Sequence, residues 1–229
     1  MPVTKALISI AAALLLAVLP ARAQDDELVY RLELGAGAGA NFGFYDINAK
    51  VGLSGSAIVR FPLNPRMAVK AQLGYATVKG STDGVADFYP ADTNAPGDAR
   101  LAYSVSSGLY TLGAMYELHF LPYGYVGGYQ GYKRVTPFVQ LGLSVSYAAA
   151  GKAVALGVPI GAGVKYKAGP RLNLALDWVT HFTLSDKIDG LSAPHGIKTT
   201  GFRGKDHFST LQFTLTYDLC PRCPTCNRD

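Results

Sequence analysis

Three cysteines near the C-terminus form the densest cluster of reactive side chains in the sequence. Cys220, Cys223 and Cys226 are each separated by two residues, in the run Cys-Pro-Arg-Cys-Pro-Thr-Cys. This spacing suits zinc or an iron–sulfur cluster, but such a site needs a fourth ligand from elsewhere in the chain. In an oxidising compartment, one disulfide plus one spare thiol is the favoured interpretation, and the spare thiol could bridge to a partner. We therefore expect disulfide chemistry rather than a metal or a passive tail, and which cysteines pair stays open.

A histidine and a serine two residues apart raise the possibility of hydrolysis. His207 and Ser209 would share one face of a strand. A nucleophilic serine also needs an orienting acid and an oxyanion site. The adjacent Asp206 would point to the opposite face, so we expect no catalysis. His119 and His181 could in principle hold a metal, but hydrogen-bonded interior histidines are the simpler interpretation, and we expect neither a metal nor a cofactor.

The elements that position these residues are strands, because apolar residues recur at every second position. The clearest example is a hairpin of two long alternating segments joined by the turn 168–171. A period of two places successive side chains on opposite faces of a strand. Eight such segments cover residues 28–34, 51–61, 67–75, 101–121, 139–147, 156–166, 172–182 and 211–219. In the fourth segment the phase slips near Ser106 and Ser107, which predicts a β-bulge.

The N-terminus reads as a secretory signal peptide. Lys5 precedes an apolar run over residues 6–19, and Ala21-Arg22-Ala23 is a small-x-small cleavage site. We expect cleavage after residue 23, a barrel over residues 24–219 and a cysteine-rich tail over residues 220–229. No later stretch approaches the roughly 20 continuous apolar residues of a membrane-spanning helix. A membrane location would therefore require a barrel.

The segments have the length and the two faces of membrane-spanning strands. About 9–11 tilted residues cross a bilayer, with apolar side chains facing lipid and polar ones facing the lumen. The 26 glycines and 14 tyrosines fit small lumenal positions and aromatic girdles. The formal charge of +5 is too mild to indicate a nucleic-acid partner, and two of the positive charges lie in the signal peptide. We predict an all-β fold, an eight-stranded antiparallel up-and-down transmembrane barrel.

Charged residues on the second face should fill the interior of this barrel. Eight strands leave a lumen just wide enough for side chains, and buried charges must be paired. The predicted lumenal set is nearly balanced in sign, which favours a plug of ion pairs over an open pore. It comprises Arg31, Glu33, Arg60, Lys70, Glu117, His119, Lys165, Asp177, His181 and Asp218.

The connections alternate between short and long. Outer-membrane barrels have short periplasmic turns and long outer loops, so residues 79–100 and 185–207 are expected outside, and both termini in the periplasm. The connection 122–136 breaks this rule, because it is long yet periplasmic by parity. It carries Tyr123, Tyr125, Tyr129, Tyr132, Lys133 and Arg134. We predict a partner-binding surface there, and a tyrosine belt on a flexible loop is the alternative.

Several stretches resemble the PorG-like outer-membrane barrels of the type IX secretion system. They are residues 118–123 (LHFLPY), 133–138 (KRVTPF), 161–166 (GAGVKY), 171–178 (RLNLALDW), 184–191 (LSDKIDGL), 205–207 (KDH) and 217–221 (YDLCP). The resemblance implies a non-catalytic barrel that anchors a periplasmic ring of a lipoprotein and a partner protein. It implies a role in protein secretion and, in some bacteria, gliding motility. The matching positions Leu121, Pro122 and Tyr123, with residues 186–191, are structural.

Three function classes follow from these observations. The first is a docking barrel of a secretion machine, with the lipid bilayer and the periplasmic ring subunits as partners. The second is a lipid-modifying enzyme, since some lipid A deacylases are eight-stranded barrels with a His-x-Ser pair. The third is an adhesion or small-solute barrel that acts through its outer loops. The tyrosine-rich turn and the cysteine tail favour the first, because both lie on the expected periplasmic side.

Overall fold

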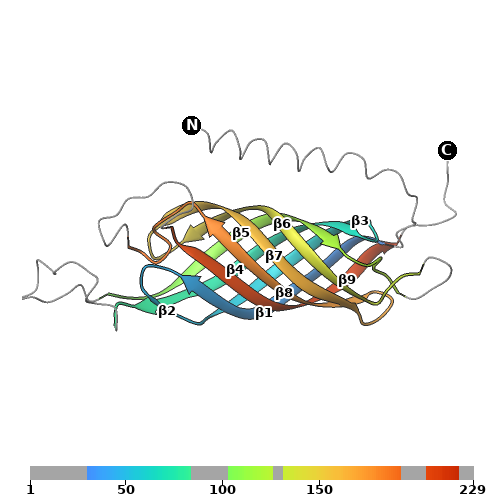
Figure 1. Cartoon of the computed structure of the whole chain (residues 1–229), viewed down its shortest axis with the longest axis horizontal. Coiled ribbons are helices and arrows are strands. Elements are labelled where there is room, and N and C mark those ends of the chain that lie inside the picture. Colours follow the sequence, from blue (N-terminus) through green and yellow to red (C-terminus); the bar gives the residue numbers. More distant parts are fainter. Residues whose placement is uncertain (1–29, 84–102, 126–130, 192–204, 222–229) are drawn as a thin grey trace, which may run out of the picture.

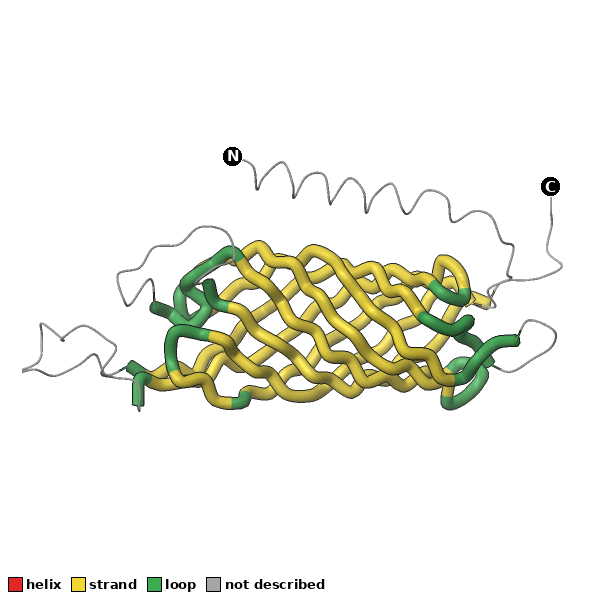
Figure 2. The backbone as a smooth tube through the Cα atoms, viewed as in Figure 1, coloured by secondary structure: helices red, strands yellow, loops and turns green. Residues whose placement is uncertain are grey.

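The computed structural model describes residues 30–83, 103–125, 131–191 and 205–221. In these ranges the chain forms a closed antiparallel β-barrel whose strands wind obliquely around its long axis (Figures 1 and 2). No helix in these ranges is long and apolar enough to cross a membrane. The strands are β1 (Tyr30–Phe44), β2 (Asn48–Lys50), β3 (Gly52–Asn64), β4 (Met67–Ser81), β5 (Ser104–His119), β6 (Val135–Ala148), β7 (Ala153–Lys167), β8 (Leu172–Thr183) and β9 (His207–Pro221).

The barrel wall has eight strand positions around its circumference, here called staves, as the sequence predicts. Each stave pairs with its neighbours in the chain, and β9 pairs with β1 to close the cylinder. The short β2 lies beside β4 and extends the stave that β3 forms, so nine strands make eight staves. Because β9 pairs with β1, the described strands leave no free edge, which is the condition for β structure in a bilayer.

The two ends of the barrel differ in their connections. One end, here called the turn end, carries the paired residues Tyr30 and Pro221 and the connections 65–66, 120–134 and 168–171. The other, here called the loop end, carries the connections 45–47, 82–103, 149–152 and 184–206. The even number of staves therefore brings both ends of the barrel segment to the turn end.

The outward face is apolar over the whole cylinder. Leu53 and Leu143 are 72% and 71% exposed, and thirty-one other large apolar side chains among the described residues are exposed as well. Along β5 and the residue that follows it, the outward apolar row runs from Tyr110 to Phe120, which at about 3.3 Å per residue and a tilt of about 45° covers roughly 23 Å. This height matches the roughly 25 Å apolar band of outer-membrane barrels. The exposed side chains are therefore placed to meet hydrocarbon.

A row of tyrosines marks the loop-end border of the apolar band. Tyr75 of β4 lies directly opposite Tyr110 of β5, and Tyr110 lies opposite Tyr147 of β6. The rings of Tyr75 and Tyr110 are 5.3 Å apart between centroids. Tyrosine suits the interface because its ring is apolar while its hydroxyl reaches water. The row corresponds to one of the aromatic girdles that the tyrosine content predicts.

The predicted bulge in the fourth segment is wrong. Strands β4 and β5 pair without a register shift from Met67 and Leu118 to Ser81 and Ser104. The apparent change of phase at Ser106 and Ser107 arises because Leu109 points into the barrel, where it is fully buried. The apolar side changes from the outer to the inner face near the loop end, and the backbone alternation is unbroken.

Candidate functional site

The turn-end half of the lumen is filled by an ion-pair network. Arg60 of β3 pairs with Glu33 of β1 and with Glu117 of β5, where Nε and Oε2 are 2.7 Å apart. Lys70 of β4 lies 3.4 Å from Glu117. Lys165 of β7 donates to Glu33 at 2.6 Å. All five side chains are buried, so each charge depends on its partners to offset lost hydration.

The network extends across the barrel to β8 and into a second cluster beneath the turns. Lys70 Nζ lies 3.3 Å from Asp177 on β8. Lys167 of β7 pairs with Asp218 of β9 and also donates to Asn173 of β8 at 3.0 Å. Together the two clusters hold four basic and four acidic side chains, so their formal charges cancel. This arrangement is the ion-pair plug that the sequence predicts.

Nine of the ten predicted lumenal residues are buried, and Arg31 is the exception. It lies at the start of β1 and is exposed. The predicted lumenal set did not include Lys167, although this residue follows Lys165 by two positions and therefore shares its face of the strand. His119 lies near Glu117 and packs edge-on against Phe138. His181 instead stacks on Phe208, with 4.4 Å between centroids. The two histidines have separate surroundings, which does not favour a shared metal.

Tyr123 covers the lumen at the turn end of the barrel. Its hydroxyl donates to Asn173 Oδ1 at 2.8 Å, and Lys165 Nζ lies 4.6 Å from its ring centroid. Lys167 Nζ lies 5.7 Å from the same centroid. Burial raises the pKa of Tyr123 far above its usual range, so the hydroxyl stays neutral and donates. Tyr123 is thus part of the plug, with its ring turned toward the barrel interior.

The rest of the tyrosine-rich turn is tied to its neighbour. Arg134 donates from Nε to the Lys167 carbonyl and from Nη2 to the Ala168 carbonyl, both at 3.1 Å. Its guanidinium also lies 5.0 Å from the ring centroid of Tyr125. Tyr125 is 44% exposed, Lys133 is exposed and Tyr132 is half-buried. Tyr129 lies outside the described residues.

Cys220 is exposed at the end of β9, with a positive φ of 54°. Cys223 and Cys226 lie outside the described residues, as does the predicted signal peptide over residues 1–23. The disulfide prediction therefore remains a prediction. Cys220 lies at the same end of the barrel as the turn that carries Tyr125 and Lys133, since Pro221 pairs with Tyr30.

The His207 and Ser209 pair lies on the outward face near the loop end. Ser209 is 2% exposed, and its Oγ is 2.6 Å from the Thr180 hydroxyl of β8. His207 Nδ1 accepts the backbone N–H of Thr183. No hydrogen bond between the described residues joins Ser209 to a carboxylate. Within the described ranges the serine hydroxyl is therefore engaged by Thr180, whereas a nucleophile would need a base and an orienting acid.

The loop-end half of the lumen is apolar instead of ionic. Ile188, from the connection after β8, is fully buried against Leu109 and Phe208. The other buried members of this apolar layer are Ala76, Val78, Ala148 and Ala155, and Tyr45 and Val105 pack on it. Between the two layers a cavity of about 20 Å³ touches Gln72 and Gln212. That volume corresponds to about one water molecule, so the cavity is too small for a solute.

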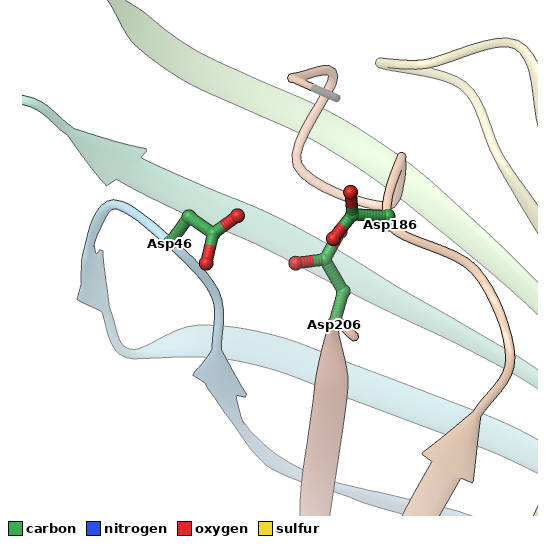
Figure 3. Close-up of side chains that lie close together, drawn as sticks. All are labelled: Asp46, Asp186 and Asp206. Atoms are coloured by element: carbon green, nitrogen blue, oxygen red, sulfur yellow. The ribbon is translucent and has the colours of Figure 1, made fainter. Parts of the chain in front are cut away.

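Aspartates gather above the apolar layer. Oxygens of Asp46, Asp186 and Asp206 lie within 4.8 Å of one another (Figure 3). Asp206 accepts the backbone N–H groups of Ile188 at 2.8 Å and of Asp189 at 3.4 Å, so it holds the turn that inserts Ile188. Burial and the charge of Asp189 raise the pKa of Asp206 to about 8. The sequence analysis did not select this cluster, because its members come from separate connections.

Known proteins show the following similarities to this chain. A family model described as outer membrane protein beta-barrel domain matches residues 9–218. A search of curated proteins found no match. Among solved structures, Neisserial surface protein A is similar, with 14% identity and a TM-score of 0.47 over 82% of this chain and 97% of that one. The N-terminal β-barrel domain of Pseudomonas aeruginosa OprF has 16% identity and a TM-score of 0.40 over 80% and 96%. The Ail protein of Yersinia pestis has 10% identity and a TM-score of 0.40 over 82% and 97%.

Proposed function

The chain belongs to the family of outer membrane protein β-barrel domains, and from this premise we propose that it is a sealed, non-catalytic barrel that anchors a periplasmic partner. The turn end faces the periplasm in this proposal. The partner class is the lipoprotein and ring subunits of a type IX secretion machine, with a role in secretion, in gliding motility or in both. Support for that class comes from the sequence resemblance to PorG-like barrels.

A filled lumen argues that the function lies at the ends of the barrel. Charged residues occupy the turn-end half, and Tyr123 covers them. Apolar residues occupy the loop-end half, where Ile188 is fully buried. A continuous water path would have to displace both layers, and each is stabilised by contacts between several strands. A channel or a solute carrier is therefore disfavoured relative to an anchor.

The observation that carries the docking proposal is the geometry of the turn between β5 and β6. Arg134 binds two backbone carbonyls of the neighbouring turn and stacks on Tyr125, which remains 44% exposed. Lys133 beside it is exposed. An exposed tyrosine held by an arginine offers a partner an aromatic contact at a low entropic cost, and aromatic residues are enriched in interfaces. The turn thus has features of a preorganised binding surface.

The other two function classes have weaker support. Lipid modification would require Ser209 to be reachable, yet it is buried and bonded to Thr180. An adhesion or small-solute role would place function in the outer loops, and Ile188 of the connection after β8 is instead buried in the lumen. Of these two, the loop-based role is the stronger alternative, because the aspartates at the loop end offer polar groups.

Crosslinking in the periplasm followed by affinity capture of the barrel tests the docking proposal. We expect the wild-type chain to capture a lipoprotein, and Tyr125→Ala with Lys133→Ala to reduce the yield at least fivefold. Arg66→Ala, on another turn of the same end, is the matched control. Gel mobility of heated and unheated samples verifies that each variant folds. Recovery of the barrel alone from wild-type cells, or equal yields from all variants, would contradict docking at this turn.

A further inference from the structure

Basic side chains alone supply the charge around the rim of the turn end in the described part of the chain. Five positive charges lie there, and no ion pair joins any of them to a described carboxylate. The acidic residues of this end, Glu33, Glu117 and Asp218, are buried in the lumen and paired there. The five basic residues are Arg31, Arg66, Lys133, Arg134 and Arg171. Their excess of positive charge attracts anions to the rim.

The described residues of the loop end carry no such excess. Five lysines and five aspartates lie at that end, so their formal charges cancel. The lysines are Lys50, Lys79, Lys152, Lys187 and Lys205, and the aspartates are Asp46, Asp83, Asp186, Asp189 and Asp206. Attraction for an anionic surface is therefore expected at the turn end rather than at the loop end.

Arg171, in the turn between β7 and β8, combines exposure with a fixed position. Its backbone carbonyl accepts the N–H of Asp218 at 2.8 Å, which ties the turn to β9. Its Nε donates to the Tyr30 hydroxyl at 3.2 Å, and the guanidinium carbon lies 5.4 Å from the Tyr30 ring centroid. Hydrogen bonds with the hydroxyl groups of Tyr30 and Tyr217 raise the pKa of Arg171. The tyrosines therefore orient a guanidinium that is exposed and that a ligand can reach.

The side chains next to Arg171 belong to the lipid-facing surface of the barrel. Tyr217 of β9 lies opposite Leu172 of β8 on one side and opposite Leu34 of β1 on the other. Residues opposite each other on paired strands share a face, and all three side chains are exposed. Leu172 directly follows Arg171, so Arg171 lies where the apolar surface ends. The polar headgroups of a bilayer begin at this same border.

We propose that Arg171, held by Tyr30 and Tyr217, binds the phosphate group of an anionic phospholipid at the turn end. A guanidinium presents a planar fork of donors that matches a phosphate, and the tyrosines restrict its movement before the lipid binds. The acyl chains lie along the exposed Leu172 and Leu34. An anionic lipid is favoured over phosphatidylcholine, because the ammonium group of phosphatidylcholine offsets the charge of its phosphate.

The leucines beside Arg171 favour a lipid over an acidic protein as the occupant. A protein that approached from the aqueous side would meet the guanidinium but would leave the exposed apolar row unused, whereas a phospholipid contacts both. This inference goes beyond the docking proposal and does not rest on it, because docking is assigned to Tyr125 and Lys133 on a different turn.

Native mass spectrometry of the full chain tests the proposal. The folded barrel is released from micelles that contain equal amounts of phosphatidylglycerol and phosphatidylcholine with the same acyl chains. We expect the wild-type barrel to retain phosphatidylglycerol about fivefold more often than phosphatidylcholine, the ratio expected from one basic residue at a membrane surface. Arg171→Gln removes the fork and the charge, so it should lower the retained phosphatidylglycerol by about the same factor.

The matched control is Arg66→Gln. Arg66 is exposed at the same end of the barrel, but in the described ranges its side chain has no ring contact or hydrogen bond with a tyrosine. Retention of phosphatidylglycerol by this variant should stay within about twofold of wild type, because an exposed, unheld cation binds weakly. Gel mobility of heated and unheated samples verifies that both variants fold.

Equal retention of the two lipids by wild type, or equal retention of phosphatidylglycerol by wild type and Arg171→Gln, would overturn the proposal. An equal loss in Arg66→Gln would overturn the assignment to Arg171, since diffuse attraction by the whole rim would then explain the binding. Reduced lipoprotein capture by Arg171→Gln, with phosphatidylglycerol retention unchanged, would replace the lipid by an acidic protein. The docking variant Tyr125→Ala with Lys133→Ala should retain the lipid, so failure of the docking proposal leaves this inference intact.

Discussion

The two ends of the lumen are closed by different physical means. At the turn end, strands from opposite sides of the barrel are joined by a buried ion pair between Lys70 of β4 and Asp177 of β8. At the loop end, Ile188 is packed into an apolar layer with Leu109 and Phe208. Ion pairs are directional and intolerant of a missing partner, whereas apolar packing depends on volume. The comparison implies that the turn end is the rigid half and the loop end the adjustable half.

The largest loss of stability is expected from a substitution in the ionic half of the lumen. Glu117→Ala removes the carboxylate that pairs with both Arg60 and Lys70 and leaves their charges buried. We expect the free energy of unfolding to fall by about 3–5 kcal/mol, the usual cost of breaking a buried pair. Urea unfolding in lipid vesicles, followed by tryptophan fluorescence of Trp178, measures it. A loss below about 1 kcal/mol would show that the lumen is hydrated enough to screen these charges.

The second-largest loss of stability is expected from a substitution in the apolar half of the lumen. Ile188→Ala should cost about 2–3 kcal/mol, toward the lower part of the range for buried isoleucine, because a turn can relax more easily than a strand. The loss should be local, with faster hydrogen exchange at the loop end and unchanged exchange at Glu117. Leu184→Ala is the control, since Leu184 on the same connection is 47% exposed. Equal destabilisation by the two variants would contradict the role of Ile188 as the closing residue.

A smaller effect concerns the turn over the ionic half. Arg134→Ala removes two hydrogen bonds to backbone carbonyls and the contact with Tyr125, and we expect a loss of about 1–2 kcal/mol. Arg134→Lys should recover less than half of this, because an ammonium lacks the planar fork. The neighbouring Lys133→Ala should change stability by less than about 0.5 kcal/mol, as expected for an exposed side chain. Full recovery by lysine would indicate that charge alone holds the turn.

The smallest effect is expected outside the lumen. Ser209→Ala removes one hydrogen bond, to Thr180, and should cost about 1 kcal/mol or less. Lipid A from cells that carry this variant should give the same mass spectrum as wild type. A changed spectrum would support the lipid-modifying alternative, and would require Ser209 to become accessible in the membrane.

Strand periodicity explains why the fold could be predicted from the sequence. Alternation with a period of two reports directly which face each residue occupies, so nine of the ten predicted lumenal residues are buried. The rule fails where the apolar face turns inward, as at Leu109, because alternation does not say whether a face meets lipid or the lumen. That ambiguity produced the bulge prediction near Ser106, which the continuous register of β4 and β5 contradicts.

The sequence by itself determined the barrel, the number of staves and the charge balance of the lumen, since these depend on local alternation and on composition. Tertiary structure alone decided which charges pair, that Tyr123 turns inward, and that aspartates from three connections meet above Ile188. Such contacts join residues far apart in the chain, for example Asp46 and Asp206. Closing the cylinder sets their separation, and no sequence spacing records it.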